Sequence, residues 1–464
     1  MRTPLAHSAR KKYPPQTYEA HVRGVCERAG KYAAEAECYS VKANGILSII
    51  VRDSALLHDL GKLEERNQSV LCEQSRRRRH LPVDHTDAGS AALQKMGSGC
   101  AAMLVYSHHQ GLPDLSTEFA ARGCSIFRNG NAEVRAETDA ALPALLRQHE
   151  ALFPRKPNKE VQAYDGDPAV FLRMALSCPA DADHGDTAAA FGQTEKAMPE
   201  LRPQERLAAL DHYVSKFGET DERSSLRREL YLSCRSAEAH SGFSVCGSPV
   251  GSGKTTAVMA HLLEQACKRN ARRIFVVLPY TSIIRQSVDI YRKALVLPGE
   301  TPEDVVAELH SRADFEDIET RYLTALWRAP IVVTTAVAFF ETLSSHNPAA
   351  LRRLHELPGS LIFVDEAHSA LPLRLLPLAW HWMNVLSDEW SCYWVLASGS
   401  LVRYWELQPL FGLSMPRPEI AELVRPDLQR ELSRYESNRI TFRWREKPIG
   451  RKELAEWVQE ALGP

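Results

Sequence analysis

The spacing of apolar residues changes about halfway along the chain. From residue 16 to about residue 215, apolar side chains recur every three or four positions, as in YEAHVRGVCERAGKYAAEA and DPAVFLRMALSCPADAD. This spacing places the apolar side chains on one face of an α-helix. The pattern therefore predicts an all-α domain over residues 1–215.

After about residue 240, short continuous apolar runs alternate with helical segments. Examples are RRIFVVLPY, APIVVTTAV, GSLIFVDEA and CYWVLASGS. Such runs are typical of a parallel sheet whose two faces are both covered by helices. The chain is therefore predicted to be multidomain. We expect a linker and leading helix over 216–240 and an α/β lobe with a mainly parallel sheet over 241–412. Residues 413–464 would form the start of an incomplete second lobe or a C-terminal extension.

Composition narrows the class of protein. The chain has 464 residues, of which 44% are hydrophobic and 25% charged, as in ordinary globular proteins. The net charge is −1, so nucleic-acid binding would depend on local basic grooves. The densest basic run, Arg76–Arg79, is a solvated loop or a phosphate contact.

The cysteines and the apolar segments indicate the compartment. Ten cysteines occur without a CxxC pair, which argues against a zinc ribbon and a disulfide scaffold. No segment has the length of a membrane span, and the N-terminus lacks a secretory apolar region. We expect a cytoplasmic protein that does not contact a membrane.

Histidines and aspartates of the first domain favour a metal site. The segment SALLHDLGKLEE places His58 and Asp59 side by side, and a buried pair of this kind is costly without a partner. Imidazole and carboxylate together suit manganese, iron, nickel, cobalt or zinc. Because neighbouring helical residues point about 100° apart, Asp59 is placed to bridge two ions. The remaining candidate ligands are His21, His85, His108, His109 and an aspartate of ADAD.

The second half of the chain contains a candidate ATP site. SPVGSGKTTA lies between a predicted strand and a helix, where backbone N–H groups can surround phosphates. LIFVDEAHSA places Asp365 and Glu366 at the carboxyl end of a strand, to hold Mg²⁺ and to orient the attacking water. The candidate residues for ATP and Mg²⁺ are Gly251, Ser252, Gly253, Lys254, Thr255, Thr256 and Asp365.

These motifs resemble known families. LLHDLGKL, DHTDAGS, SHHQG and ADADHGDT resemble the HD phosphohydrolase superfamily and, more narrowly, the HD nuclease domain of CRISPR-associated nuclease-helicases. VVLPYTSIIRQS, VVTTAVAFFETL and ASGSL are similar to strand-end loops of DExH helicases, although Gly399 departs from their usual SAT. The resemblance covers about residues 16–410.

The resemblance implies roles for individual residues. His21, His58, Asp59, His85, His108 and His109 would bind two divalent ions (Mn, Ni, Co, Fe or Mg), and Lys62 would contact the substrate phosphate. Asp181 and Asp183 both fit the closing ligand, and ADHGDT favours Asp183. Asp59, Lys62 and Glu366 would be catalytic. Thr281, Ser282, Thr334 and Thr335 would contact single-stranded nucleic acid, or would simply cap helices.

The implied activity is cleavage of single-stranded DNA, joined to an ATP-dependent 3′–5′ helicase that degrades target DNA recognised by an RNA-guided CRISPR surveillance complex. The second motor lobe and its arginine are missing after ASGS, so we expect weak ATP binding and hydrolysis near nil for this chain alone. A separate chain could supply the missing lobe. Two alternatives stay open. One is an HD phosphohydrolase acting on free nucleotides, and the other is an inactive partner that binds DNA or the surveillance complex.

Overall fold

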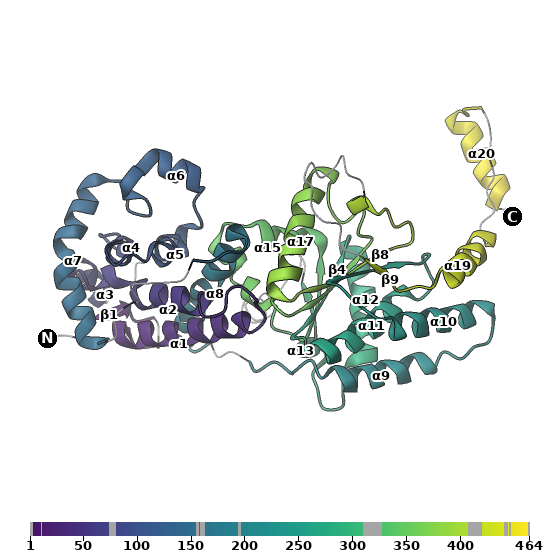
Figure 1. The fold of residues 1–464 in the computed structure, drawn as a ribbon, viewed down its shortest axis with the longest axis horizontal. Helices are drawn as coiled ribbons and strands as arrows, with labels where there is room; N and C mark the ends of the chain where they lie inside the picture. Colours follow the sequence, from purple (N-terminus) through teal and green to yellow (C-terminus); the bar gives the residue numbers. More distant parts are fainter. Residues whose placement is uncertain are drawn as a thin grey trace.

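The computed structural model consists of a helical domain followed by an α/β lobe (Figure 1). It describes residues 3–10, 12–73, 80–154, 157, 163–193, 196–309, 327–406, 420–439, 444 and 447–462. The basic run Arg76–Arg79 and residues 413–419 lie outside this description. Across the described ranges, every helix is too short or too polar to cross a lipid bilayer.

The helical domain confirms the predicted all-α fold. It contains α1 (Tyr18–Glu37), α2 (Leu47–Leu57), η1 (Leu60–Leu63), α3 (Glu65–Cys72), α4 (His85–Lys95), α5 (Gly99–Gln110), α6 (Leu115–Arg122), η2 (Gly123–Ser125), α7 (Ala132–Leu152) and α8 (Pro168–Ala190). A short ribbon of β1 (Leu5–His7) and β2 (Gln16–Thr17) precedes them. The central helix α1 packs against α2 and α8, and both of these also contact α5.

Side-chain caps fix where the site-bearing helices begin. Thr17 accepts a hydrogen bond from the N–H of Ala20 at the start of α1, and Asp84 accepts one from Thr86 at the start of α4. Asp167 caps α8, whose first residue is a proline. Such caps satisfy N–H groups that have no partner within the helix. The caps therefore position the helices that carry His21, His85 and Asp183.

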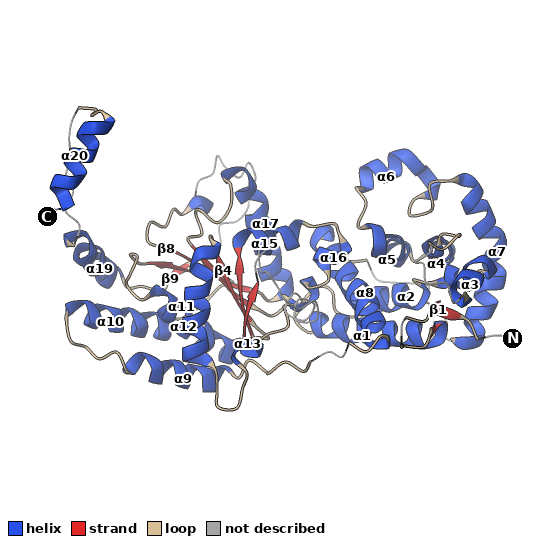
Figure 2. Ribbon diagram, turned by 180° about the vertical axis from the view of Figure 1, so that it is seen from behind, coloured by secondary structure: helices blue, strands red, loops and turns tan. Residues whose placement is uncertain are grey.

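The α/β lobe confirms the predicted parallel sheet (Figure 2). Among the described residues its seven strands have the order β5-β6-β4-β7-β8-β3-β9, and every pair is parallel. The strands are β3 (Phe243–Gly247), β4 (Ile274–Leu278), β5 (Val306–Leu309), β6 (Ile331–Thr335), β7 (Leu361–Asp365), β8 (Tyr393–Ser398) and β9 (Ala421–Glu422).

Helices cover both faces of this sheet. Ile274 and Val276 of β4 pack with α11 (Lys254–Arg269) and α12 (Thr281–Leu295) on one face. Phe275 and Val277 pack on the other face with α15 (Ala336–Ser344) and α17 (Leu376–Trp390), in a core that continues into the helical domain. The two domains therefore share one hydrophobic core.

The remaining elements connect or flank these layers. They are α13 (Pro302–Val305), α16 (Pro348–Leu351), η3 (Leu354–Glu356), η4 (Leu373–Leu375) and η5 (Tyr404–Glu406). Near the C-terminal end, α19 (Pro426–Asn438) packs against α10, and α20 (Arg451–Leu462) extends beyond the lobe (Figure 1).

The division between the domains differs from the predicted boundaries. Both α9 (Pro203–Ser215) and α10 (Glu222–Ser236) pack on α11, so the segment before residue 240 joins the α/β lobe instead of ending the helical domain or forming a linker. β9 pairs with β3, so residues 421–422 belong to the seven-stranded sheet of the α/β lobe. Periodicity indicated these helices but could not indicate which core their apolar faces join.

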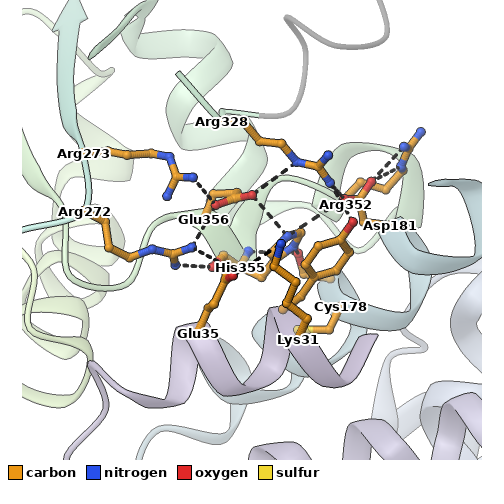
Figure 3. A network of polar contacts seen from close by, with 12 residues as sticks. Lys31, Glu35, Cys178, Asp181, Arg272, Arg273, Arg328, Arg352, His355 and Glu356 are labelled. Atoms are coloured by element: carbon orange, nitrogen blue, oxygen red, sulfur yellow. Dashed lines mark hydrogen bonds and ion pairs between the residues drawn. The ribbon is translucent and has the colours of Figure 1, made fainter. Parts of the chain in front are cut away.

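A buried ionic network joins the two domains (Figure 3). Glu356 of η3 pairs with Arg273 at 2.7 Å and with Arg272 at 3.0 Å, and Arg272 also reaches Glu35 of α1 at 3.1 Å. Burial would raise the pKa of Glu356, but the charge of Arg273, the hydrogen bond from His355 and the charge of Arg272 hold this pKa well below its usual range. The ionised Glu356 therefore stabilises the folded chain.

We predict that Glu356→Gln lowers the free energy of unfolding by about 3 kcal/mol at neutral pH, because it leaves buried guanidinium groups uncompensated. The carboxyl group has a lower pKa in the folded chain than in the unfolded chain, so its contribution is complete above the ordinary pKa of 4.5 and declines as the pH falls below it. Urea denaturation of both proteins at a series of pH values would measure the difference. The exposed Glu19→Gln is the control, and a pH-independent difference would contradict the prediction.

Candidate metal centre and nucleotide site

His58 and Asp59 both face the same small space, because α2 ends at Leu57. His58 is the C-cap, and Asp59 has left the helix with φ −110° and ψ 16°. Their side chains therefore converge, with His58 Nε2 3.3 Å from Asp59 Oδ2. The prediction that the doublet diverges by about 100° was wrong here, since it assumed that the helix continues through both residues.

His21 of α1 lies in contact with both residues of the doublet. Its Nε2 lies 3.2 Å from Asp59 Oδ2, 3.3 Å from Asp183 Oδ1 and 3.3 Å from His58 Nε2. Its Nδ1 lies 2.8 Å from Asp186 Oδ2. A histidine that donates from Nδ1 to a carboxylate presents Nε2 to a metal in a fixed orientation.

A second group of ligands lies on the other side of Asp59. His85 Nε2 is 3.6 Å from Asp59 Oδ1 and 3.0 Å from His109 Nε2. His108 donates from Nδ1 to the carbonyl of Val105 at 2.6 Å, and its buried Nε2 has no hydrogen-bond partner among the described residues. An unpartnered buried nitrogen of this kind fits a metal ligand.

The ligand atoms form overlapping groups that share Asp59. His21, His58 and Asp59 each offer one ligand atom within 4.8 Å of the others, and so do Asp59, His85, His108 and His109. Imidazole and carboxylate form a suitable donor set for a divalent transition metal. The residues therefore fit two cations that Asp59 would bridge.

Asp183, and not Asp181, lies in this cluster. Asp183 approaches His21, whereas Asp181 pairs with Arg352 at 2.7 Å and Arg328 at 2.6 Å in the domain interface. Lys62 lies beside Asp59, with 2.6 Å between Nζ and Oδ2. Two neighbouring candidates for the closing ligand thus project to different sides of α8.

Sequence reasoning missed two polar residues of the cluster. Asp186 orients His21 and follows Asp183 by three positions, a spacing that places both on one helix face and could have indicated it. His7 of β1 can share an ion with His21 and Asp183, and its Nε2 lies 3.1 Å from Thr187 Oγ1. His7 carried no local signal, because β1 reaches the site through its tertiary contacts with α1, α3 and η1.

Burial and charge set the protonation of the ligands. Burial lowers the pKa values of His85 and His108 to about 4, which leaves both imidazoles neutral near pH 7. Burial opposes ionisation of Asp59, but the charges of Lys62 and His58 hold its pKa well below the usual range. Burial also opposes protonation of His21, yet its carboxylate partners raise this pKa to about 10. Neutral imidazoles and ionised carboxylates are the forms that bind metals, so a cation at His21 would displace the proton from its Nε2.

The candidate ATP site lies at the carboxyl edge of the sheet. Gly251 and Gly253 have φ values of 84° and 89°, which favour glycine, and Lys254 begins α11. The ammonium of Lys254 lies 2.8 Å from Asp365 Oδ1 and 3.1 Å from Glu366 Oε1. The N-terminus of α11 and the acidic pair therefore face one another, as phosphate and Mg²⁺ binding requires.

The remaining residues of the predicted phosphate loop lie around this pair. Ser252 is buried and donates to the carbonyl of Pro249, Thr255 is half-buried, and Thr256 donates to the carbonyl of Gly253 at 3.0 Å. Ser398 of β8 donates to Glu366 at 2.6 Å, because register places Gly247 opposite Ser398 and Asp365 opposite Ala397. The ASGS segment thus contacts the acidic strand end.

The predicted nucleic-acid residues divide into two pairs. Thr281 and Ser282 are exposed at the start of α12. Thr334 is buried, and the hydroxyl of buried Thr335 caps α15 by accepting from Ala338 at 3.1 Å. Of the two pairs, only the first has exposed side chains.

Comparisons with known proteins agree with this architecture. The family model described as DEAD/DEAH box helicase matches residues 236–375, and a search of curated proteins found no match. The crystal structure of Cas3 with ATP from T. fusca is 18% identical, with a TM-score of 0.54, and the match covers 89% of this chain and 54% of that one. The ADP form is 17% identical, with a TM-score of 0.55, over 90% of this chain and 54% of that one.

The chain has the Cas3 fold. It spans about half the length of the T. fusca Cas3 structures that it matches. In this fold the helical domain that contains the His-Asp cluster precedes the lobe that contains the candidate ATP site.

We predict that Asp186→Asn weakens Mn²⁺ binding by about 10- to 100-fold, the usual cost of losing a group that orients a metal-bound histidine. The amide can still accept a hydrogen bond but no longer carries the charge that orients His21. Isothermal titration with Mn²⁺ would measure the change. Asp139→Asn removes a carboxylate that pairs with Arg128 and Lys95 and should leave the affinity unchanged. Equal affinities of the Asp186→Asn variant and the wild type would contradict the orienting role.

Proposed function

We propose that this chain is a metal-dependent nuclease of single-stranded DNA joined to an ATP-binding helicase lobe. The observation that carries the proposal is the pair of ligand groups that share Asp59. A pair of divalent cations a few ångströms apart can generate a nucleophile from water and stabilise the leaving oxygen of a phosphodiester. The ordered motifs and the Cas3 fold support the same activity.

The chain's own residues would hold the cations and the substrate. His21, His58 and Asp183 would bind one cation, and His85, His108 and His109 the other, with Asp59 between them. Asp186 would keep His21 oriented. Lys62 carries a positive charge beside the cluster and would contact the scissile phosphate.

Access to the cluster favours a flexible single strand. His21, His58, Asp59 and His108 are buried, whereas His85 is half-buried and His109 is exposed. The cluster thus opens at the end of α5. There the N–H of Leu112 donates to the carbonyl of His346, which belongs to the α/β lobe, at 3.0 Å. A strand that leaves the lobe would meet the open side of the cluster first.

The α/β lobe would bind ATP with Mg²⁺ and contribute to movement along DNA. Lys254 would reach the β- and γ-phosphates, Thr255 and Asp365 would hold Mg²⁺, and Glu366 would orient water. From the resemblance of the motifs, we infer movement in the 3′–5′ direction, a second motor lobe that completes the ATP site, and target DNA delivered by an RNA-guided surveillance complex. This proposal places the chain in antiviral defence.

We predict that Asp59→Ala reduces Mn²⁺-dependent cleavage of circular single-stranded DNA by more than about 100-fold, because even groups that only orient metal ligands cost 10- to 100-fold. Gel analysis of nicked and linear products would measure it. Asp53→Ala removes a buried carboxylate from α2, the helix that precedes Asp59, and should retain cleavage. Asp53 pairs with Arg52 at 3.1 Å.

The same assay separates the alternatives. Metal-dependent hydrolysis of free nucleotides that is lost in Asp59→Ala, without cleavage of DNA by the wild type, would indicate a nucleotide phosphohydrolase. A wild type that binds DNA but neither metal nor nucleotide would indicate an inactive partner.

We predict that Lys254→Ala weakens binding of ATP by about 10- to 100-fold, since a hydrogen bond from a charged group contributes about 1.5–3 kcal/mol. Titration with a fluorescent ATP analogue and Mg²⁺ would measure it, with the exposed Lys293→Ala as control. Cleavage of DNA by this variant should remain, because the metal cluster lies in the other domain. An unchanged affinity for ATP would exclude this lobe as the nucleotide site.

A further inference from the structure

The helix α8 contacts the metal cluster on one side and the α/β lobe on the other. Asp183 and Asp186 face His21. About two turns before Asp183, Ser177 donates to the carbonyl of Leu351 at 2.7 Å and accepts from the N–H of His355 at 2.9 Å. A single helix thus carries both a candidate metal ligand and part of the domain interface.

Asp181 is a charged contact of α8 with the α/β lobe. Arg352 donates to Asp181 Oδ1 from Nε at 2.9 Å and from a terminal nitrogen at 2.7 Å, and Arg328 donates to Oδ2 at 2.6 Å. Figure 3 shows Asp181 reached by both arginines. Asp181 is fully buried, so charge-assisted bonds of this kind are strong and directional.

The two arginines lie near β6 and β7, the strands of the α/β lobe that lead to candidate motifs. Arg328 precedes β6, which ends at Thr335 and leads into α15. Arg352 is the C-cap of α16, and the chain continues from there through η3 to β7, which ends at Asp365. Asp181 is therefore bound to the residues that precede β6 and to the connection from β6 to β7.

The sequence of α8 makes an external anchor important. Pro179 lies inside the helix and has no N–H, so one internal hydrogen bond is missing a single turn before Asp183. A helix weakened in this way depends more on contacts outside it for the position of its following turns. The ion pairs of Asp181 lie in that region.

We propose that Asp181, held by Arg352 and Arg328, is a positioning residue for the metal centre. It fixes the turn of α8 that carries Asp183 and Asp186, so that the α/β lobe sets the geometry of one of the two cation sites. This inference rests on the proposed function. It adds that the nuclease site is built in part by the motor lobe.

The test is a calorimetric titration with Mn²⁺ of the full chain carrying Asp181→Asn. Asparagine keeps the size of the side chain but loses the charge-assisted bonds. We expect the dissociation constant of the cation bound by His21 and Asp183 to rise by about tenfold or more. The cation bound by His85, His108 and His109 should keep its affinity, whereas a general loss of folded protein would weaken both sites equally.

Two further variants keep the test decisive. Arg352→Lys retains the charge without the two-point contact and should show a smaller loss, which makes it the informative variant should Asp181→Asn fail to fold. Glu389→Gln is the matched control. This buried glutamate also lies in the domain interface, where it accepts from Tyr164 at 2.5 Å and from the N–H of Asp167 at the far end of α8.

The outcomes distinguish the inference from the proposed function. A wild type that binds no Mn²⁺ would overturn the proposed function. A wild type that binds two Mn²⁺ ions, with unchanged affinities in both Asp181→Asn and Arg352→Lys, would overturn the positioning role alone. Equal weakening by Glu389→Gln would overturn it as well, because the effect would then belong to the interface in general.

Discussion

The need to balance charge around a buried carboxylate governs the helical domain. Asp59 is 1% exposed, and its oxygens lie among imidazoles and one ammonium that come from separate elements. An isolated carboxylate in such a place would be strongly unfavourable. Lys62 provides part of the compensation within the chain, and divalent cations would provide the rest. The helices must therefore hold these groups together.

The same requirement extends through α8 into the α/β lobe. Asp181 and Glu356 are buried carboxylates that are paired with arginines, and each arginine reaches across or along the domain interface. Removing one member of such a network leaves the others unpaired, so the two domains depend on one another for stability. The shared hydrophobic core, which runs from α1 to α17, reinforces this dependence.

At the carboxyl edge of the sheet, the register of the strands brings opposite charges together. Parallel pairing of β3, β7 and β8 brings the phosphate loop, the acidic pair and Ser398 to one place, although they are far apart in the sequence. Lys254 and the two acidic residues then neutralise one another across the space where phosphate and Mg²⁺ would bind. Both candidate sites thus arise where elements end, and where side chains are free to converge.

The sequence by itself determined the helical domain, the parallel sheet and the residue types of both sites. Helical spacing, continuous apolar runs and compact motifs such as GSGKT and DEAH are local, and local patterns reflect the environment of each segment. The sequence also contained the whole ordered set of histidines and aspartates. It left open the choice between Asp181 and Asp183, and it gave no reason to consider His7.

Only the tertiary structure decided these points. Asp181 and Asp183 are chemically identical and nearly adjacent, and they separate because one side of α8 faces His21 while the other faces Arg352. The end of α2 at Leu57 turned an expected divergence of His58 and Asp59 into convergence. Likewise, α9 and α10 belong to the α/β lobe because their apolar faces pack against α11. Such outcomes depend on contacts between segments distant in the chain, which no local pattern encodes.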